Sequence, residues 1–343
     1  MSYNIALNFE DGVTRFIGCK EGETVLDAAY RQKVNLPMDC SDGVCGTCKG
    51  HCVQGDFDLG DDYLEDALSE EEEAEGLVLT CQMVPSSDCV IQVPMASALC
   101  KTQIGAFEGK VAAIEPLSED SIDLVVDLDE NAELAFLPGQ YVHIQIPGSD
   151  QTRSYSFSSF PGSTQASFLI RNIPQGLMSG YLNGAAKPGD RLTMTGPMGS
   201  FYLRDITRPV LMLAGGTGLA PFLSMLAQLA EKGCDQPIHL IYGVNKDDHL
   251  VKCEALDAFV EKLPGFSYTT VVVDEASDHP RKGYVTHHMD RKVLNDGDVD
   301  VYLCGPPPMV DAVLHYFDDQ GIAPQSFHYE KFTPNQAKQE GAA

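Results

Sequence analysis

The sequence has few basic residues and no apolar run near its start. Lys and Arg number 23 against 50 Asp and Glu, so the formal net charge of the 343 residues is −27. A surface this acidic repels phosphate backbones and anionic membranes, which argues against nucleic acid as a partner. The first twenty residues carry polar and charged groups throughout and lack the apolar core of a secretory signal. We therefore expect a cytoplasmic protein that binds neither nucleic acid nor membranes.

Disorder is also excluded, because 43% of the residues are hydrophobic and 21% are charged, which suffices to bury a core. The length suits two or three domains. Residues 209–230 lack charge over about the length of a membrane span, but a glycine-rich turn at 215–218 and Pro221 interrupt them. This pattern predicts a strand, a turn and a helix instead of a membrane segment.

The eleven cysteines lack the two C-x2-C pairs that are typical of zinc sites. Four of them have the spacing Cys40-x4-Cys45-x2-Cys48, with Cys81 after another 32 residues, which is typical of plant-type [2Fe–2S] clusters. Without a secretory signal, a disulfide framework is the weaker interpretation. We predict that these four thiolates hold a [2Fe–2S] cluster. The nearby Cys52 is either a buried thiol, which we favour, or a competing ligand.

The residues around these cysteines suit a cluster. Gly43 and Gly46 let the backbone approach the sulfur atoms and aim N–H groups at them. Cys81 follows the apolar residues 77–80, which predict a strand. This stretch resembles the plant-type ferredoxin family, and residues 1–98 are expected to form its β-grasp-like domain.

Local patterns within this first domain predict several elements. Residues 5–9 and 14–17 alternate like the strands of a hairpin, and a helix is expected to start at Thr24 with Asp27 in its first turn. Ser69 and Glu72 form a capping-box pattern for a short helix over 69–75. Residues 56–75 contain eleven carboxylates. Such a run is usually a solvated face, and the alternative is a docking surface for a basic electron acceptor.

Residues 99–106 are expected to be a linker and 107–207 a second domain. Short strand patterns separated by turn residues are typical of a small antiparallel barrel, here of six strands. The expected strands are 109–115, 122–128, 141–146, 154–158, 166–171 and 191–195.

Residues 208–333 alternate between strand and helix patterns, which predicts a parallel α/β domain that binds a nucleotide, and 334–343 are expected to be a loose tail. The expected strands are 210–214, 238–243, 268–273 and 299–304, and the expected helices are 222–231, 254–262 and 309–320. The predicted fold class is therefore multidomain, with α+β and α/β parts.

The middle domain carries a pattern that suits a flavin. Arg153, Tyr155 and Ser156 offer, along one strand, a cation for a pyrophosphate, a ring to stack on the flavin and a hydroxyl for its N5. The segment 175–179, Gln-Gly-Leu-Met-Ser, predicts a helix N-terminus whose free N–H groups bind phosphate. The alternative is an ordinary barrel strand with an exposed arginine.

The last domain lacks the full G-x-G-x-x-G pattern of dinucleotide sites. Gly215-Gly216-Thr217-Gly218 nevertheless joins a strand to a helix, where the backbone can approach a pyrophosphate. A tight structural turn is the alternative. Cys304-Gly305-Pro306 ends a later strand at the carboxyl edge of the sheet, where ligands bind in such folds.

Together these motifs resemble the ferredoxin–NADP⁺ reductase superfamily. Arg153-x-Tyr155-Ser156 is similar to its flavin motif, residues 215–218 to its pyrophosphate turn, and residues 304–306 to its nicotinamide-side motif. Glu330-Lys331-Phe332 is similar to its terminal Glu-x-aromatic, which implies that Phe332 covers the flavin and Glu330 lies by the nicotinamide. The order of the three domains resembles the reductase components of the benzoate, toluate and anthranilate dioxygenases.

Asp274-Glu275 follows the expected strand 268–273, where NADPH-using relatives have a Ser-Arg pair. Carboxylates repel a 2′-phosphate and accept hydrogen bonds from a free 2′-hydroxyl, which favours NADH. The alternative is that both are ordinary loop residues.

These interpretations assign four sets of residues. The catalytic candidates are Ser156, Cys304, Glu330 and Phe332. The candidates for flavin contact in the middle domain are Arg153, Tyr155, Ser156, Arg171, Gly176, Met178 and Ser179. The further cofactor contacts are Gly215, Gly216, Thr217, Gly218, Asp274, Glu275, Cys304, Gly305, Pro306, Met309 and Phe332. The metal ligands are Cys40, Cys45, Cys48 and Cys81.

The resemblance implies an NADH-dependent electron-transfer reductase of a two-component aromatic-ring dioxygenase. NADH would deliver two electrons as hydride to FAD, and single electrons would pass to the [2Fe–2S] cluster and on to a Rieske-type terminal oxygenase. FAD is implied by the resemblance alone. One alternative is the reductase of a phenol- or methane-type monooxygenase. Another is a non-catalytic binding module in which the four cysteines hold zinc.

Overall fold

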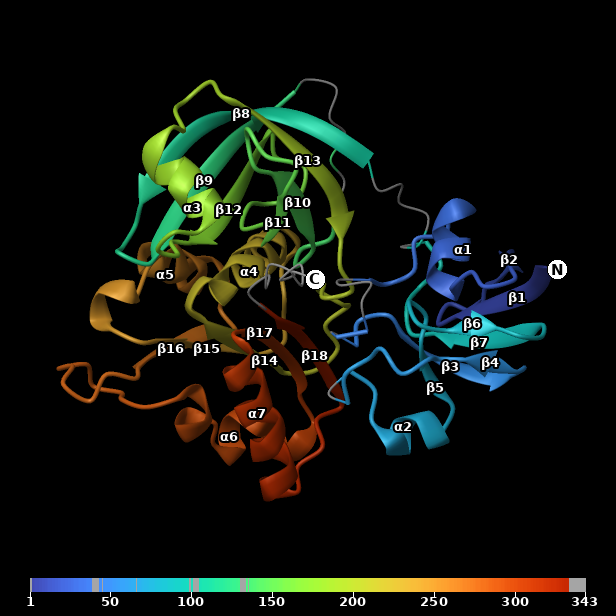
Figure 1. The fold of residues 1–343 in the computed structure, drawn as a ribbon. Coiled ribbons are helices and arrows are strands. Elements are labelled where there is room, and N and C mark those ends of the chain that lie inside the picture. Colours follow the sequence, from blue (N-terminus) through green and yellow to red (C-terminus); the bar gives the residue numbers. More distant parts are fainter. Residues whose placement is uncertain are drawn as a thin grey trace, which may run out of the picture. The chain divides into compact units, whose positions relative to one another are not determined.

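The structure is a computed structural model that describes residues 2–38, 43–44, 46–65, 67–98, 100, 105–129, 134 and 136–332. The chain divides into two compact units, Met1–Ala106 with Thr195–Ser200 and Phe107–Met194 with Phe201–Ala343. Figure 1 labels the elements of both units. No helix among the described residues is long and apolar enough to cross a membrane.

The first unit contains a five-stranded mixed sheet in the order β2–β1–β7–β3–β5 and a two-stranded sheet of β4 and β6. The strands are β1 (Ser2–Phe9), β2 (Thr14–Lys20), β3 (Lys49–Gln54), β4 (Phe57–Asp58), β5 (Leu77–Leu79), β6 (Val84–Pro85) and β7 (Cys89–Val93). β1 pairs antiparallel with β2 and parallel with β7, and β3 pairs antiparallel with β7 and β5. This arrangement, with α1 (Val25–Arg31) packed beside β2, confirms the β-grasp-like fold.

Both helix starts predicted for this unit are present. The Thr24 side chain accepts a hydrogen bond from the backbone N–H of Asp27 and caps α1, which buries Val25, Leu26, Ala28 and Ala29. Ser69 and Glu72 form a reciprocal capping box at α2 (Glu70–Ala74). The cap satisfies free backbone N–H donors at the start of α2. This matters because α2 buries none of its residues and so gains little stability from packing.

A six-stranded antiparallel barrel opens the second unit, with its strands in the order β11–β10–β13–β8–β9–β12. The strands are β8 (Gly105–Pro116), β9 (Ser121–Leu128), β10 (Tyr141–Gln145), β11 (Thr152–Ser156), β12 (Gln165–Arg171) and β13 (Arg191–Met198). A bridge between Phe157 and Phe168 links the end of β11 to β12, so the barrel nearly closes. The fully buried Phe157 stacks on Phe136 inside it. Helix α3 (Leu177–Gly184) follows β12.

A five-stranded parallel sheet in the order β16–β15–β14–β17–β18 completes the second unit. Its strands are β14 (Val210–Gly215), β15 (Ile238–Val244), β16 (Phe266–Val272), β17 (Asp300–Gly305) and β18 (Ser326–Lys331). The α-helices are α4 (Ala220–Lys232), α5 (Cys253–Lys262), α6 (Arg291–Leu294) and α7 (Pro307–Gln320). The 3₁₀ turns are η2 (Gly216–Leu219), η3 (Asp247–His249), η4 (Val285–His288) and η5 (Asn295–Gly297).

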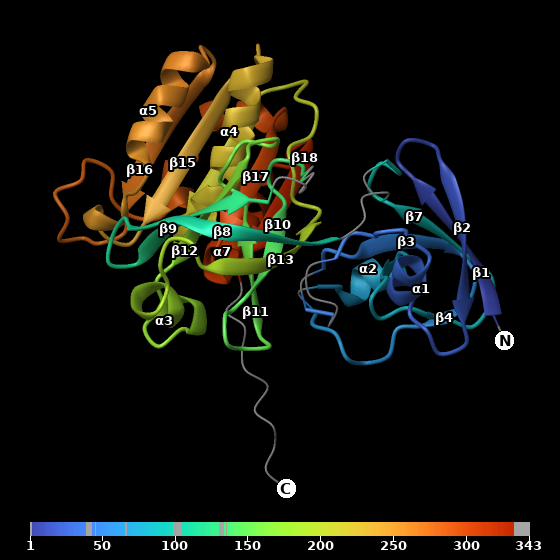
Figure 2. The same cartoon turned by 90° about the horizontal axis from the view of Figure 1, so that it is seen from above.

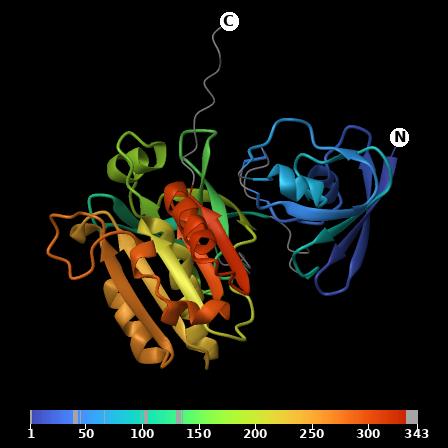
Figure 3. The same cartoon turned by 90° about the horizontal axis from the view of Figure 1, so that it is seen from below.

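Helices cover both faces of this sheet. Met212 of β14 packs in a core with α4 and α5, while its neighbours Leu211 and Leu213 pack with α7. Figures 1, 2 and 3 show α4 and α5 on one side of the strands and α7 on the other. β15 and β17 flank β14, so the strand order reverses at β14. Ligands bind in such folds at the carboxyl ends of the strands beside this reversal, here at Gly215 and Gly305.

Candidate functional site

Two of the four predicted cluster ligands lie in the described part of the chain, and the structure brings them together. Cys48 precedes β3 and Cys81 follows β5, and these strands pair so that Lys49 lies opposite Leu79. The sulfur atoms of Cys48 and Cys81 are 3.2 Å apart, and both side chains are buried. Cys40 and Cys45 lie outside the described residues. Converging, buried thiol donors fit a thiolate-bound metal cluster.

The glycines of the predicted cluster loop occupy positions that other residues would not tolerate. Gly43 and Gly46 have φ values of 74° and 70°. A Cβ at Gly43 would lie 2.7 Å from Cβ of Tyr63, and one at Gly46 would lie 3.1 Å from the carbonyl oxygen of Ala67. Tyr63 and Ala67 therefore pack directly on the backbone of Gly43 and Gly46, which agrees with the close backbone approach expected there.

Cys52 is engaged away from the Cys48–Cys81 pair. Its sulfur donates to the carbonyl oxygen of Gln54 at 3.4 Å. Burial raises the pKa of Cys52, and it raises the pKa of Cys89 to about 12, so both are protonated at neutral pH. This environment supports the interpretation of Cys52 as a partly buried thiol.

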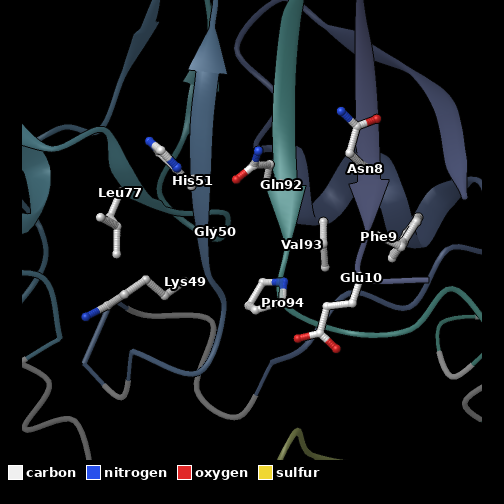
Figure 4. A pocket seen from close by; sticks show the side chains of 10 residues that line it. All are labelled: Asn8, Phe9, Glu10, Lys49, Gly50, His51, Leu77, Gln92, Val93 and Pro94. Carbon is white, nitrogen blue, oxygen red and sulfur yellow. The ribbon is translucent and has the colours of Figure 1, made fainter. Parts of the chain in front are cut away.

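A shallow pocket of about 490 Å³ lies on the sheet of the first unit (Figure 4). One of its lining residues, Lys49, directly follows Cys48 in the sequence. His51 of β3 and Gln92 of β7 are paired neighbours in the register and line it together with Lys49 and Leu77. The Lys49 ammonium bonds the Glu72 carboxylate at 2.6 Å. Among the described residues, no cysteine lines this pocket.

In the second unit, Ser156, Cys304 and Glu330 come from three strands and meet at one point. Cys304 of β17 and Glu330 of β18 are paired neighbours, and Ser156 ends β11. The Ser156 hydroxyl donates to Oε2 of Glu330 at 3.1 Å, and Sγ of Cys304 lies 3.9 Å from the same oxygen. All three side chains are buried. This cluster joins the predicted flavin strand to the predicted nicotinamide-side turn.

The Cys304 thiol is a hydrogen-bond donor and not a charged nucleophile. Burial raises its pKa well above the ordinary value, and the Glu330 carboxylate adds to this shift. The thiol is therefore neutral at physiological pH, and the Glu330 carboxylate has two neutral donors facing one of its oxygens.

The two predicted turns at the carboxyl edge lie against each other. A Cβ at Gly215 would be 2.5 Å from Sδ of Met309 and 2.9 Å from Cδ of Pro306. A Cβ at Gly218 would overlap the carbonyl group of Cys304. The glycines therefore bring the backbone after β14 beside the backbone after β17. Phe332 is also tethered here, because its N–H donates to the carbonyl oxygen of Gly305 at 3.0 Å.

Arg153 and Tyr155 lie on β11 as predicted, but their side chains have different surroundings. The Arg153 guanidinium reaches the carbonyl oxygen of Thr152 and the side chain of Gln151. Tyr155 packs on the edge of the barrel core, and burial raises the pKa of its hydroxyl. A guanidinium bonded to two uncharged groups and a partly covered ring two positions along β11 fit a flavin phosphate and ring.

Gly176 is the N-cap of α3 and offers no side chain to cap it, so the first backbone N–H groups of the helix have no side-chain acceptor there. This fits the binding of a phosphate group. Ser179 and Met178 play another part. The Ser179 hydroxyl accepts from the N–H of Ile173 and donates to the carbonyl oxygen of Arg171, while Met178 is buried in the barrel core. Ser179 and Met178 therefore stabilise the conformation of the segment that leads into α3.

Asp274 and Glu275 are exposed in the loop after β16, as expected. The Asp274 carboxylate accepts from the N–H of Ala276, and the Lys282 ammonium donates to the carbonyl oxygen of Glu275. Sequence reasoning missed that Lys282 and Arg281 fold back beside Val272. Their adjacent charges were visible in the sequence, but only the loop's return to the strand brings the Lys282 ammonium to the carbonyl oxygen of Glu275.

Three protein families match successive parts of the chain. Residues 8–86 match the family described as a 2Fe-2S iron-sulfur cluster binding domain. Residues 108–202 match an oxidoreductase FAD-binding domain, and residues 212–315 match an oxidoreductase NAD-binding domain. The chain is thus an oxidoreductase with binding domains for the three predicted cofactors.

Curated relatives match nearly the whole chain. The toluate 1,2-dioxygenase electron transfer component of Pseudomonas putida is 55% identical over 97% of this chain and 99% of its own. The 2-halobenzoate counterpart of Burkholderia cepacia is 48% identical over 97% and 99%. The anthranilate counterpart of Acinetobacter baylyi is 42% identical over 97% and 98%. Among solved structures, a cytochrome P450 reductase of Amycolatopsis is 31% identical, with a TM-score of 0.75, over 97% of this chain and 100% of its own.

Proposed function

Because the chain belongs to the family of 1,2-dioxygenase electron transfer components, we propose that it is the NADH-dependent reductase of an aromatic-ring dioxygenase. Its direct electron acceptor is the oxygenase component, through a Rieske centre. The function is divided among residues 1–98 for the cluster, 107–207 for FAD and 208–333 for NADH.

When bound, FAD would supply the conversion of a two-electron hydride from NADH into single electrons, and a [2Fe–2S] cluster would supply a one-electron carrier. Cys48 and Cys81 hold the cluster together with Cys40 and Cys45. Arg153, Tyr155 and the N-terminus of α3 hold FAD, and the turns after β14 and β17 hold NADH.

The observation that carries this proposal is the meeting of Ser156 with Cys304 and Glu330. Ser156 belongs to the barrel and the other two residues belong to the parallel sheet. Groups predicted for the flavin side and for the nicotinamide side therefore lie within hydrogen-bonding reach of one another. Glu330 fixes the direction of the Ser156 hydroxyl, and the three buried side chains would exclude water where a bound nicotinamide meets a bound flavin.

The absorption spectrum of the purified protein tests the proposal. Flavin bands with broad iron–sulfur absorbance, bleached by NADH under anaerobic conditions, are expected. A colourless, zinc-containing protein would instead support the non-catalytic module. A second assay supplies the reductase with either a Rieske dioxygenase component or a phenol-type monooxygenase component and measures product formation. Only the correct oxygenase should turn over, which separates the two reductase functions.

The change Cys81→Ser tests the cluster assignment. Loss of the fourth thiolate should remove the iron–sulfur absorbance and abolish NADH-driven cytochrome c reduction, because single electrons no longer leave through the cluster. Reduction of ferricyanide by the flavin should persist. Cys52→Ser is the matched control and should leave both activities intact, because the Cys52 thiol donates to the carbonyl oxygen of Gln54. If Cys81→Ser keeps both activities, the ligand assignment fails.

A further inference from the structure

A turn of the barrel is joined to a loop of the parallel sheet by a buried histidine. The turn between β8 and β9 carries Glu119 and Asp120, and the loop after β15 carries His249. Nε2 of His249 lies 3.1 Å from Oε1 of Glu119, and Nδ1 lies 3.1 Å from Oδ2 of Asp120. The His249 side chain is only 8% exposed. Nε2 hydrogen-bonds Glu119, while Nδ1 lies close to the Asp120 carboxylate without hydrogen-bond geometry, so the ring is held between two carboxylates of the barrel turn.

Two lysines reinforce the same junction. Lys246 places its ammonium 2.6 Å from the Glu119 carboxylate, and Lys252 places its own 2.5 Å from Asp123 at the start of β9. Asp123 is buried, so removing the Lys252 ammonium would leave an uncompensated buried charge at this junction. Lys252 also adopts φ 60°, which is uncommon for a side chain larger than glycine's. The backbone before α5 is thus held in a strained conformation where the lysine meets the barrel.

A metal-binding site is the alternative interpretation of these acidic and histidine side chains. Ligand atoms of Glu119, Asp248 and His249 lie within 4.8 Å of one another. The Lys246 ammonium already neutralises the Glu119 carboxylate at 2.6 Å and would repel a metal ion. The geometry therefore favours an ion-pair junction.

On the barrel side, the turn is bonded to the segment that leads to α3. Asn172 donates its backbone N–H to the carbonyl oxygen of Asp120 and its side-chain amide to that of Glu119. Asn172 lies between Arg171 and Ile173, whose backbone groups are fixed by the Ser179 hydroxyl. The turn is thus continuous with the segment proposed to bind the FAD phosphates.

On the other side, the loop is bonded to the segment that carries the two predicted ribose ligands. The Ser277 hydroxyl donates to Oδ1 of Asp247 at 2.8 Å. The N–H of Asp274 donates to the carbonyl oxygen of Asn245 at 2.9 Å. Asp247 is two residues before His249. The histidine therefore lies midway along a bonded chain from the FAD-phosphate segment to the NADH-ribose segment.

We propose that His249, with Glu119 and Asp120, is a positioning residue for hydride transfer. It fixes the nucleotide-binding sheet against the barrel and so sets where the nicotinamide lies relative to the flavin. The inference rests on the proposed function, because it concerns the geometry of that reaction. Its contacts lie away from the Ser156, Cys304 and Glu330 cluster, so it acts through the two cofactor segments.

Stopped-flow reduction of the bound flavin by NADH in the full-length holoprotein tests this role. His249→Leu removes both polar contacts and should lower the saturating rate constant about tenfold, because small misplacement of reacting groups is costly. The NADH concentration for half-saturation should change less than about twofold. His249→Gln keeps one donor and should recover part of the rate. His315→Gln, on the exposed side of α7, is the matched control and should match the wild type.

A lower melting temperature of His249→Leu with an unchanged rate constant would show a purely structural role and overturn the proposal. If that variant loses FAD or fails to fold, Glu119→Gln and Lys246→Gln carry the test, since both side chains are more than half exposed. They should lower the saturating rate constant by a few-fold, and unchanged rates in both would again overturn it. Failure of the proposed function is distinct, because the wild type itself would then lack NADH-reducible flavin.

Discussion

At the scale of single residues, the choice of nicotinamide cofactor depends on the charges that follow β16. Asp274 and Glu275 are exposed there, and Arg281 and Lys282 return to the same strand end. A 2′-phosphate would meet the two carboxylates first if they line the ribose, while the Lys282 ammonium is already bonded to the Glu275 carbonyl oxygen. The balance of these charges favours a free 2′-hydroxyl.

We expect the double change Asp274→Ser and Glu275→Arg to narrow the preference for NADH. The double change removes two negative charges, which repel a 2′-phosphate, and adds one positive charge, which attracts it. At roughly 1 kcal/mol per screened contact, the ratio of kcat/KM for NADH over NADPH should fall by at least about tenfold. Steady-state kinetics with both cofactors measure the ratio. Asp278→Arg, an exposed change in the same loop, is the control. An unchanged ratio in the double variant would count against the assignment.

At the scale of secondary-structure elements, the turn after β14 has the tightest steric requirement of the candidate site. Gly218 lies where a Cβ would overlap the carbonyl group of Cys304, which is backbone and cannot move aside as a flexible side chain does. The turn itself is a 3₁₀ helix, η2, that leads into α4. The strand, the turn and the helix start are therefore fixed together by their contact with the end of β17.

Gly218→Ala should destabilise the protein by about 1 to 3 kcal/mol, because one methyl group forces β17 and η2 apart. Thermal unfolding and the affinity for NAD⁺ measure the effect, and both should fall. Gly180→Ala is the matched control: Gly180 is exposed in α3 and a Cβ added there would have no neighbour within 4 Å, so the change should leave stability equal or slightly higher. Equal melting temperatures for the two variants would refute the steric argument.

Local signals predicted most elements of the fold, and pairing over long distances accounts for what they missed. The caps at Thr24 and Ser69 and the strand before Cys81 depend on neighbouring residues, and all three are confirmed. β18 was not predicted as a strand, because its Ser326–Lys331 sequence becomes a strand only by pairing with β17. The Ser156–Glu330 hydrogen bond joins residues 174 positions apart, which no local pattern reveals.

At the scale of the whole molecule, the net charge of −27 sets how partners approach. The acidic segment 56–75 includes α2, which buries none of its residues and is followed by the strand that leads to Cys81. Within it Glu72 is paired with Lys49, and Glu73 accepts from the Tyr63 hydroxyl. Glu70 and Glu71 are exposed at the start of the helix. A basic electron acceptor would be attracted to this segment before it contacts the surface near the cluster.

Electron transfer to a basic protein such as cytochrome c should therefore become slower as the salt concentration rises. We expect its second-order rate constant to fall about tenfold from low salt to roughly 0.3 M, because screening shortens the reach of the attraction. Glu70→Gln with Glu71→Gln should flatten this dependence, while the flavin is still reduced by NADH at the same rate. Asp318→Asn with Asp319→Asn removes the same charge from the exposed end of α7 and is the control. Equal salt slopes for the two double variants would show that total charge, and not the acidic segment, guides the acceptor.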